Sequence, residues 1–161
     1  LIRNVDALKE STDILITDAP AGASESALSF VAASQRVLVV VVAEPTSFMD
    51  AYAMIKAAYA EHGLRHFSIA INMAHDSADA RRNFEKFSAI AARFLDVELT
   101  YAGHVPLSAA MRRSVVQRKP LLATANNTPD KELLAFKDLA QAVLKAPLNT
   151  YEGIRFFADK A

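Results

Sequence analysis

The sequence contains no cysteine, only four glycines in 161 residues, and as many basic as acidic residues. The absence of cysteine excludes disulfides, thiolate zinc sites and cysteine nucleophiles. A formal net charge of zero argues against a chain-wide nucleic-acid surface and leaves only a local basic patch for that role. The longest apolar run, at 37–43, is too short to span a bilayer. What remains is an ordinary globular composition, 52% apolar and 22% charged.

Four short apolar segments predict β-strands, at 13–17, 36–43, 67–73 and 97–104. The second run is apolar on both of its faces, which is typical of a parallel strand covered by helices on each side. Segments with helical spacing lie between the strands and after the last one. This alternation predicts an α/β fold in three layers, with a mostly parallel sheet and helices on both of its faces.

One domain is expected over residues 1–146, followed by a tail at 147–161. The chain begins at Leu1, and residues 1–10 have the spacing of a helix end, so we expect a segment of a longer protein. The tail has one helical stripe that either contacts a membrane or docks back on the domain. This stripe consists of Tyr151, Ile154, Phe157 and Ala158.

Capping residues predict where several helices begin and end. Ser47 and Asp50, three residues apart, form a capping-box pattern, and Gly63 fits just beyond the end of that helix. The expected N-caps of the other helices are Ser24, Asp76 or Ser77, Ser108, and Thr128 followed by Pro129.

The most informative motif follows the first predicted strand, where Asp18 precedes Pro20, Ala21 and Gly22. Ligands bind at the carboxyl ends of strands in open parallel sheets. Nucleotide switch proteins place a carboxylate here near Mg²⁺, and a glycine lets backbone N–H groups approach the terminal phosphate. The alternative is an aspartate that only organises the turn from strand to helix.

Polar residues also follow the other predicted strands. Glu44 and Thr46 follow the second strand, and Asn72 ends the third. The amide of Asn72 could recognise a purine base, or it could bond to the local backbone. Glu44 could equally be a solvated turn residue, and helix capping explains Thr46 and Asp50 without any function.

A basic cluster lies on the short helix predicted to begin after Ser108 and to stop before Pro120. It consists of Arg112, Arg113, Gln117, Arg118 and Lys119. A solvated helix face is the simple interpretation. A contact with phosphate or with a partner protein is the alternative.

These motifs together resemble the MinD/ParA-type ATPases, in particular the flagellar-number regulators of the FleN/FlhG group. Residues 13–22 are similar to the switch II, or Walker B-type, stretch of these proteins. Further similar blocks follow in order at 44–56, 71–73, 78–87 and 103–122. The resemblance extends over about residues 13–143, and the series of blocks is more specific than the switch stretch alone.

The resemblance implies a role for each matching residue. Asp18 is expected to hold the water shell of Mg²⁺, and Pro20 to Gly22 to sense the γ-phosphate of ATP. Glu44, Thr46 and Asp50 are expected at a dimer interface, facing the nucleotide of the partner subunit. Asn72 and the stretch beginning at Pro106 are expected to contact the adenine.

The resemblance also implies what this segment lacks. The glycine-rich P-loop with its lysine is expected upstream. Without the strand that carries it, the sheet has a gap between the 13–17 and 36–43 strands or closes differently. The intact parent protein is expected to be an Mg²⁺-dependent ATPase. This segment is expected to have part of the deviant-Walker P-loop fold and to be inactive on its own. Met73 stands where many relatives have an arginine that stacks on the base.

Implied partners are a second copy on ATP binding and flagellar proteins such as an SRP-type GTPase or a transcription regulator. The expected location is the cytoplasm, with peripheral contact to the inner membrane face through the tail. Two other readings stay open. One is a non-catalytic interaction domain of the same fold, and the other is a DNA-partitioning ATPase, although DNA binding is not favoured.

Overall fold

The computed structural model describes residues 5–20, 22–123, 130–150, 153 and 155–157. A short 3-10 helix, η1 (Asp6–Ser11), precedes the alternating elements. These are, in order, α2 (Glu25–Ala33), β1 (Leu38–Val42), α3 (Pro45–His62), β2 (His66–Ala74), α4 (Ser77–Ala92), β3 (Glu98–Pro106), α5 (Ala109–Gln117) and α6 (Asp130–Lys145).

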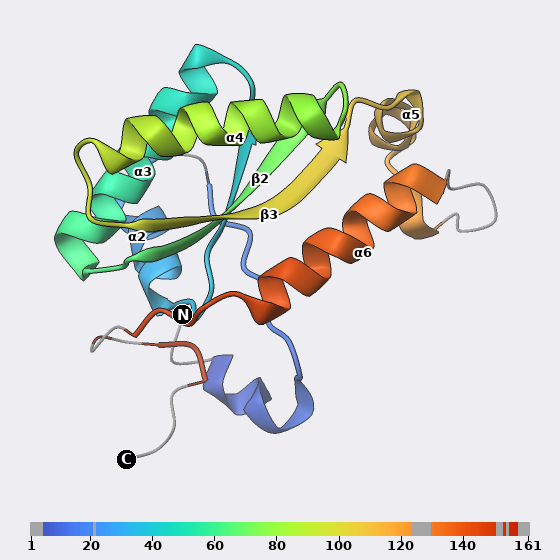
Figure 1. Ribbon diagram of the computed structural model, residues 1–161. Helices are drawn as coiled ribbons and strands as arrows, with labels where there is room; N and C mark the ends of the chain where they lie inside the picture. Colours follow the sequence, from blue (N-terminus) through green and yellow to red (C-terminus); the bar gives the residue numbers. More distant parts are fainter. Residues whose placement is uncertain (1–4, 21, 124–129, 151–152, 154, 158–161) are drawn as a thin grey trace.

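The three described strands form one parallel sheet in the order β1-β2-β3 (Figure 1). β1 aligns Val39 with Ile69 of β2, and β2 aligns Ile69 with Tyr101 of β3. Helices α3 and α4 cover one face, and α6 lies against β3 on the other (Figure 1). This arrangement confirms the predicted three-layer α/β fold with a parallel sheet.

The main core lies between the sheet and the α3–α4 layer. Val41 of β1 and Ile71 of β2 are registered neighbours and are both fully buried. They pack in one cluster with Ile55 of α3 and Phe87 of α4, and the Phe87 ring lies 5.4 Å from the Phe48 ring. β-Branched residues at alternate strand positions therefore supply the sheet side of the core, as strand geometry requires.

Helix α6 approaches β3 closely at a glycine. A Cβ atom on Gly103 would lie 3.9 Å from the backbone of Leu139, and the backbone of Gly103 has φ +142°. Any residue with a side chain would be strained in this conformation. Glycine at position 103 therefore allows both the positive φ of β3 and the close packing of α6.

The predicted strand at 13–17 is wrong, because the structure has no strand at these residues. Ile14 and Ile16 are exposed, Ile16 at 87%. A strand needs a neighbour for its N–H and C=O groups, and no described segment pairs with residues 13–17. The segment is apolar, as a strand would be, but no described part of the chain supplies a partner strand for it.

β1 is buried on one face only, which corrects the prediction that helices cover both of its faces. Val39 and Val41 are buried, whereas Leu38 and Val40 are exposed, Val40 at 56%. β1 pairs with β2 along one edge, and no described strand pairs with its other edge. The described elements therefore leave part of the apolar surface of β1 exposed to solvent.

Most predicted helix boundaries are confirmed. The side chains of Ser24, Asp76 and Ser108 accept backbone N–H bonds as N-caps, and Gly63 ends α3 with φ +67°. The capping box at 47–50 is wrong, because α3 begins at Pro45. Pro45 suits a first helical turn since it lacks an N–H, and the Ser47 hydroxyl instead accepts from the Val42 N–H at 3.0 Å. The predicted cap at Thr128 and Pro129 lies outside the described residues.

The described part of the tail packs on the domain. Asn149 is buried and its side chain bonds to residues 65 and 66 at the start of β2. Phe156 is also buried, its ring stacks on Phe30 at 6.1 Å, and its N–H donates to the Ala33 carbonyl at 3.0 Å. No residue of the tail is helical where the structure describes it, and three stripe residues lie outside that part.

Candidate functional site

The switch-like segment borders a cavity of about 510 Å³ beside the open edge of β1. Asp18, Pro20 and Gly22 line one side of it. Thr46 and Asp50, from the first turns of α3, line the other side together with residues of α2 and β1. Five residues singled out from the sequence therefore share one cavity. Ala21 lies outside the described residues.

The segments around the cavity explain how these side chains converge. Gly22 has φ +96°, a conformation that glycine adopts freely, and the chain turns there into α2. On α3, Ser47, Asp50 and Ala51 recur at helical spacing with Met54, so one stripe of the helix faces the cavity. This stripe could have been read from the sequence, but only once the start of α3 was known.

The polar character of the cavity suits a hydrated cation better than a phosphate. Asp18 and Asp50 supply two carboxylates, and Thr46 and Ser47 supply hydroxyl groups. Arg36 is the single cationic side chain among the described lining residues, and its Nε already donates to the Ala146 carbonyl at 3.0 Å. Mg²⁺ keeps several waters and typically uses one or two carboxylates plus substrate phosphates, so Asp18 fits a water-mediated role.

Phosphate binding by this chain alone does not fit the cavity. A phosphate cradle needs several backbone N–H groups in a glycine-rich loop, or free Lys and Arg side chains. Gly22 is the one glycine among the described lining residues. In addition, no three His, Cys, Asp or Glu side chains of the described residues are grouped to hold a metal directly. The site is therefore incomplete for Mg-ATP without further backbone donors.

Glu44 lies apart from this cavity, although it precedes Thr46 by only two residues. It lines a separate groove of about 440 Å³ between the start of α3 and helix α4, and Phe48 and Phe87 also line this groove. The structure thus separates Glu44 from Asp18. A role for Glu44 against a second subunit stays a prediction.

Asn72 and Pro106 lie at the carboxyl edge of the sheet, where β2 and β3 end. The Asn72 side chain accepts the Met73 N–H at 2.9 Å, which is the local alternative considered for this residue. Met73 has φ 58°, an uncommon conformation for a side chain-bearing residue. Neither Asn72 nor Pro106 lines the Asp18 cavity, so the adenine contacts stay a prediction.

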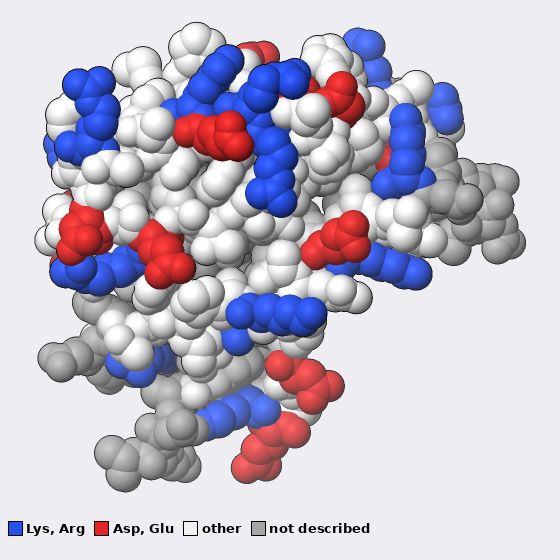
Figure 2. Space-filling model, viewed as in Figure 1, with Lys and Arg blue, Asp and Glu red and all other residues white. Residues whose placement is uncertain are grey.

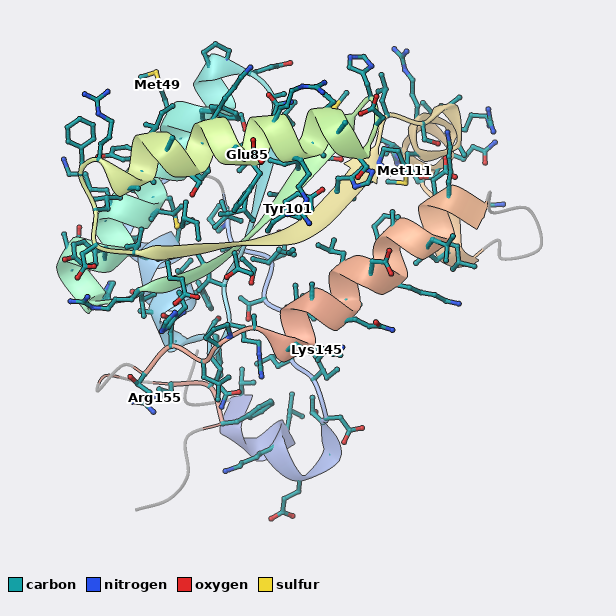
Figure 3. The ribbon with its side chains drawn as sticks, viewed as in Figure 1. Met49, Glu85, Tyr101, Met111, Lys145 and Arg155 are labelled. Carbon is teal, nitrogen blue, oxygen red and sulfur yellow. The ribbon has the colours of Figure 1, made fainter. Side chains whose placement is uncertain are left out.

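A cluster on β3 was not anticipated from the sequence. The Arg81 guanidinium of α4 lies 4.1 Å from the centre of the Tyr101 ring, beneath α4 (Figure 3). The Tyr101 hydroxyl lies 3.3 Å from His104 Nδ1, and burial raises the pKa of Tyr101 while Arg81 acts in the opposite direction. Tyr101 and His104 are three residues apart, which gives no signal in a strand with period two.

No helix in the described part of the chain is long and apolar enough to cross a membrane.

Comparisons with known proteins find curated relatives and solved structures that are similar to this chain. The chain is 38% identical over 162 aligned positions to the antiactivator FleN of Pseudomonas aeruginosa, covering 99% of this chain and 57% of FleN. It is 31% identical over 118 positions to the flagellum site-determining protein YlxH of Helicobacter pylori, covering 73% of this chain and 40% of that protein. The chain thus spans about half the length of these relatives, and no family model matches it.

Among solved structures, the MinD cell division protein of Aquifex aeolicus has a similar fold, with a TM-score of 0.60. The match covers 88% of this chain and 58% of the MinD chain at 18% sequence identity. At this identity the likeness concerns the fold alone. The MinD-like architecture agrees with the parallel three-layer arrangement of the described elements.

Proposed function

Because the chain belongs to the MinD/ParA-type flagellar-number regulators, we propose that it is the switch II and dimer-interface portion of an ATPase that controls flagella. The intact protein would bind Mg-ATP, dimerise and return to its resting state on hydrolysis. FleN is described as an antiactivator and YlxH as a flagellum site-determining protein, and both descriptions suit a regulatory ATPase of this kind.

One observation carries the proposal. Asp18, Pro20, Gly22, Thr46 and Asp50 come from two separate segments and yet line a single cavity. If Asp18 only organised the turn before α2, there would be no reason for hydroxyl and carboxyl groups of α3 to line the same cavity. The convergence supports the assignment of Asp18 to the metal side of a nucleotide site.

The open edge of β1 supports the need for an upstream half. The cavity lies along this edge, and Val40 and Leu38 are exposed beside it. A parallel strand added between β1 and residues 13–17 would pair with both, and it would bring its following loop to the carboxyl edge near Asp18. The P-loop is expected to follow this strand.

The chain's own residues then have defined tasks. Asp18 would orient metal-bound water by accepting its hydrogen bonds, and the backbone at Gly22 would donate toward the terminal phosphate. Mg²⁺ would supply charge neutralisation of the phosphates. Since phosphoryl transfer depends on positioning and electrostatics, these residues need no covalent chemistry.

We also propose the partners that such a switch requires. ATP binding would bring two copies together with Thr46 and Asp50 near the interface, and Glu44 at its rim. Flagellar proteins, such as an SRP-type GTPase or a transcription regulator, would bind the dimer. Peripheral membrane contact through the tail, at the cytoplasmic face, is a further proposal.

The test is equilibrium binding of a fluorescent ATP analogue with Mg²⁺ to two proteins. One is the 161-residue chain, and the other is a chimera that joins the upstream part of FleN to this chain. We expect no saturable binding by the chain up to about 1 mM, and dissociation constants on the order of 10 μM for the chimera. In the chimera, Asp18→Asn should remove the Mg²⁺-dependent part of binding and of ATP hydrolysis.

Asp13→Asn in the chimera is the matched control, because Asp13 is exposed in the same segment and does not line the cavity. Equal effects of the two substitutions would refute the role of Asp18. A folded chimera that binds no nucleotide would instead favour a non-catalytic interaction domain. Micromolar binding by the chain alone would show that this chain can cradle phosphates without the upstream half.

A further inference from the structure

Helix α5 presents a stripe that no described element covers. Ala109, Arg112, Arg113, Val116 and Gln117 recur at helical spacing along it and border a shallow hollow of about 310 Å³. The opposite side of α5 faces the domain, since Ala110 is buried and Met111 lies toward α6 (Figure 3). The stripe is therefore the outward face of the helix, which we call the α5 stripe.

The α5 stripe combines apolar and cationic side chains. Val116 is 79% exposed and its neighbour Val115 is 72% exposed. Arg112 and Arg113 are also exposed and lie one turn before them. These two adjacent valines in the last turn of α5 leave apolar surface in water, and covering that surface would be favourable.

The stretch of sequence that contains the stripe carries charge of one sign. No acidic residue occurs between Glu98 and Asp130, whereas Arg112, Arg113, Arg118 and Lys119 do. Basic side chains gather over the end of the molecule where α5 lies (Figure 2). Among the described residues, neither Arg112 nor Arg113 forms an ion pair with an acidic side chain. The local field is positive in a chain of zero net charge.

We propose that the α5 stripe is a docking site for an acidic amphipathic helix of a partner protein. The guanidinium groups of Arg112 and Arg113 would pair with carboxylates, for which their fork of donors is suited. An apolar side chain of the partner would enter the hollow beside Val116, in the manner of helix-in-groove recognition. This inference is independent of the proposed nucleotide site.

The features of the stripe favour a protein over a membrane or DNA. Helices that bind a lipid surface are usually longer and carry large apolar residues. Helix α5 has only nine residues, and its exposed apolar residues in the last turn are two valines. DNA would use the arginines, but the exposed valines and the hollow would contribute nothing to phosphate contacts. An acidic helix with one apolar anchor uses both kinds of side chain and matches the small apolar area of the stripe.

The test measures fluorescence anisotropy of a labelled synthetic helix, with leucines on one face and glutamates on the other, added to the 161-residue chain. A second peptide of equal charge, with serine in place of leucine, tests the apolar part. We expect saturable binding at micromolar to submillimolar peptide, and about tenfold weaker binding of the serine peptide. Amide NMR shifts on binding should be concentrated in residues 109–117.

Two variants test the residues. Arg112→Glu with Arg113→Glu, and separately Val116→Asn, should each weaken peptide binding about tenfold. The matched control is Lys56→Glu with Arg93→Glu, which change the net charge equally at two exposed positions, one on α3 and one at the C-cap of α4. Circular dichroism checks that each variant is folded.

Three results would overturn the proposal. The first is no saturable peptide binding up to about 1 mM. The second is an equal loss in the control pair, or equal binding of the serine peptide, since either would mean nonspecific charge attraction. The third is tighter binding, through the same arginines, of a duplex DNA of mixed sequence or of phosphatidylserine-containing vesicles.

Discussion

Asn149 offers the sharpest test of how the tail stabilises the domain. Its Oδ1 accepts the N–H groups of Arg65 and His66 at 3.1 and 3.0 Å, and its Nδ2 donates to the His66 carbonyl at 2.7 Å. The residue is only 7% exposed, so water cannot replace these bonds when the side chain is removed. One side chain therefore satisfies the backbone where β2 begins.

The magnitude follows from these three bonds. Each contributes about 1 kcal/mol net, and buried backbone groups left without partners add their desolvation cost. We expect Asn149→Ala to lower the free energy of unfolding by about 2–4 kcal/mol. For a domain of this size, that change corresponds to a fall in melting temperature of roughly 5–15 °C.

The assay is urea denaturation followed by circular dichroism, with Leu148→Ala as the control. Leu148 is the adjacent residue and is exposed, so its truncation should change stability by less than about 0.5 kcal/mol. If Asn149→Ala is as mild as the control, the tail does not dock on β2 in solution. The account of the tail as part of the fold would then be wrong.

Three further predictions concern the core, the open edge and a titrating group. Phe87→Ala should cost about 3–5 kcal/mol of unfolding free energy in the same assay, because the ring is fully buried, and a cost below about 1 kcal/mol would contradict the core assignment. Val40→Asp should change the stability of the chain by less than about 1 kcal/mol, whereas Val39→Asp should prevent folding; similar effects in denaturation curves would refute the assigned faces of β1. Burial raises the pKa of Tyr101 in the folded state, so its contribution to stability is complete below pH of about 10 and is lost as pH rises through the folded pKa. Tyr101→Phe should therefore remove part of the alkaline loss of stability, and an unchanged pH profile would contradict that assignment.

The layered α/β architecture was predictable from local pattern. Apolar runs at 36–43 and 67–73 became β1 and β2, and Ser24, Asp76 and Ser108 marked helix starts. Strand and helix periods, and hydrogen bonds from capping side chains, act over a few residues. Secondary structure and helix caps can therefore be predicted from the sequence, because the residues that determine them are close together along the chain.

Part of the candidate site was also foreseen. Asp18, Pro20 and Gly22 follow an apolar run, and Thr46 and Asp50 follow another, so strand ends in a parallel sheet should bring them to one edge. The structure does place them around one cavity. It separates Glu44 from them, because the first turn of α3 directs successive residues to different sides of the helix.

The sequence by itself determined the alternation of strands and helices, the helix caps and the clustering of polar residues at strand ends. Only the tertiary structure decided that residues 13–17 remain unpaired, that one face of β1 is open, and that Asn149 bonds to β2. These outcomes depend on whether a distant segment supplies a hydrogen-bond partner or a covering surface. No local pattern of residues contains that information, because pairing and burial are properties of two segments at once.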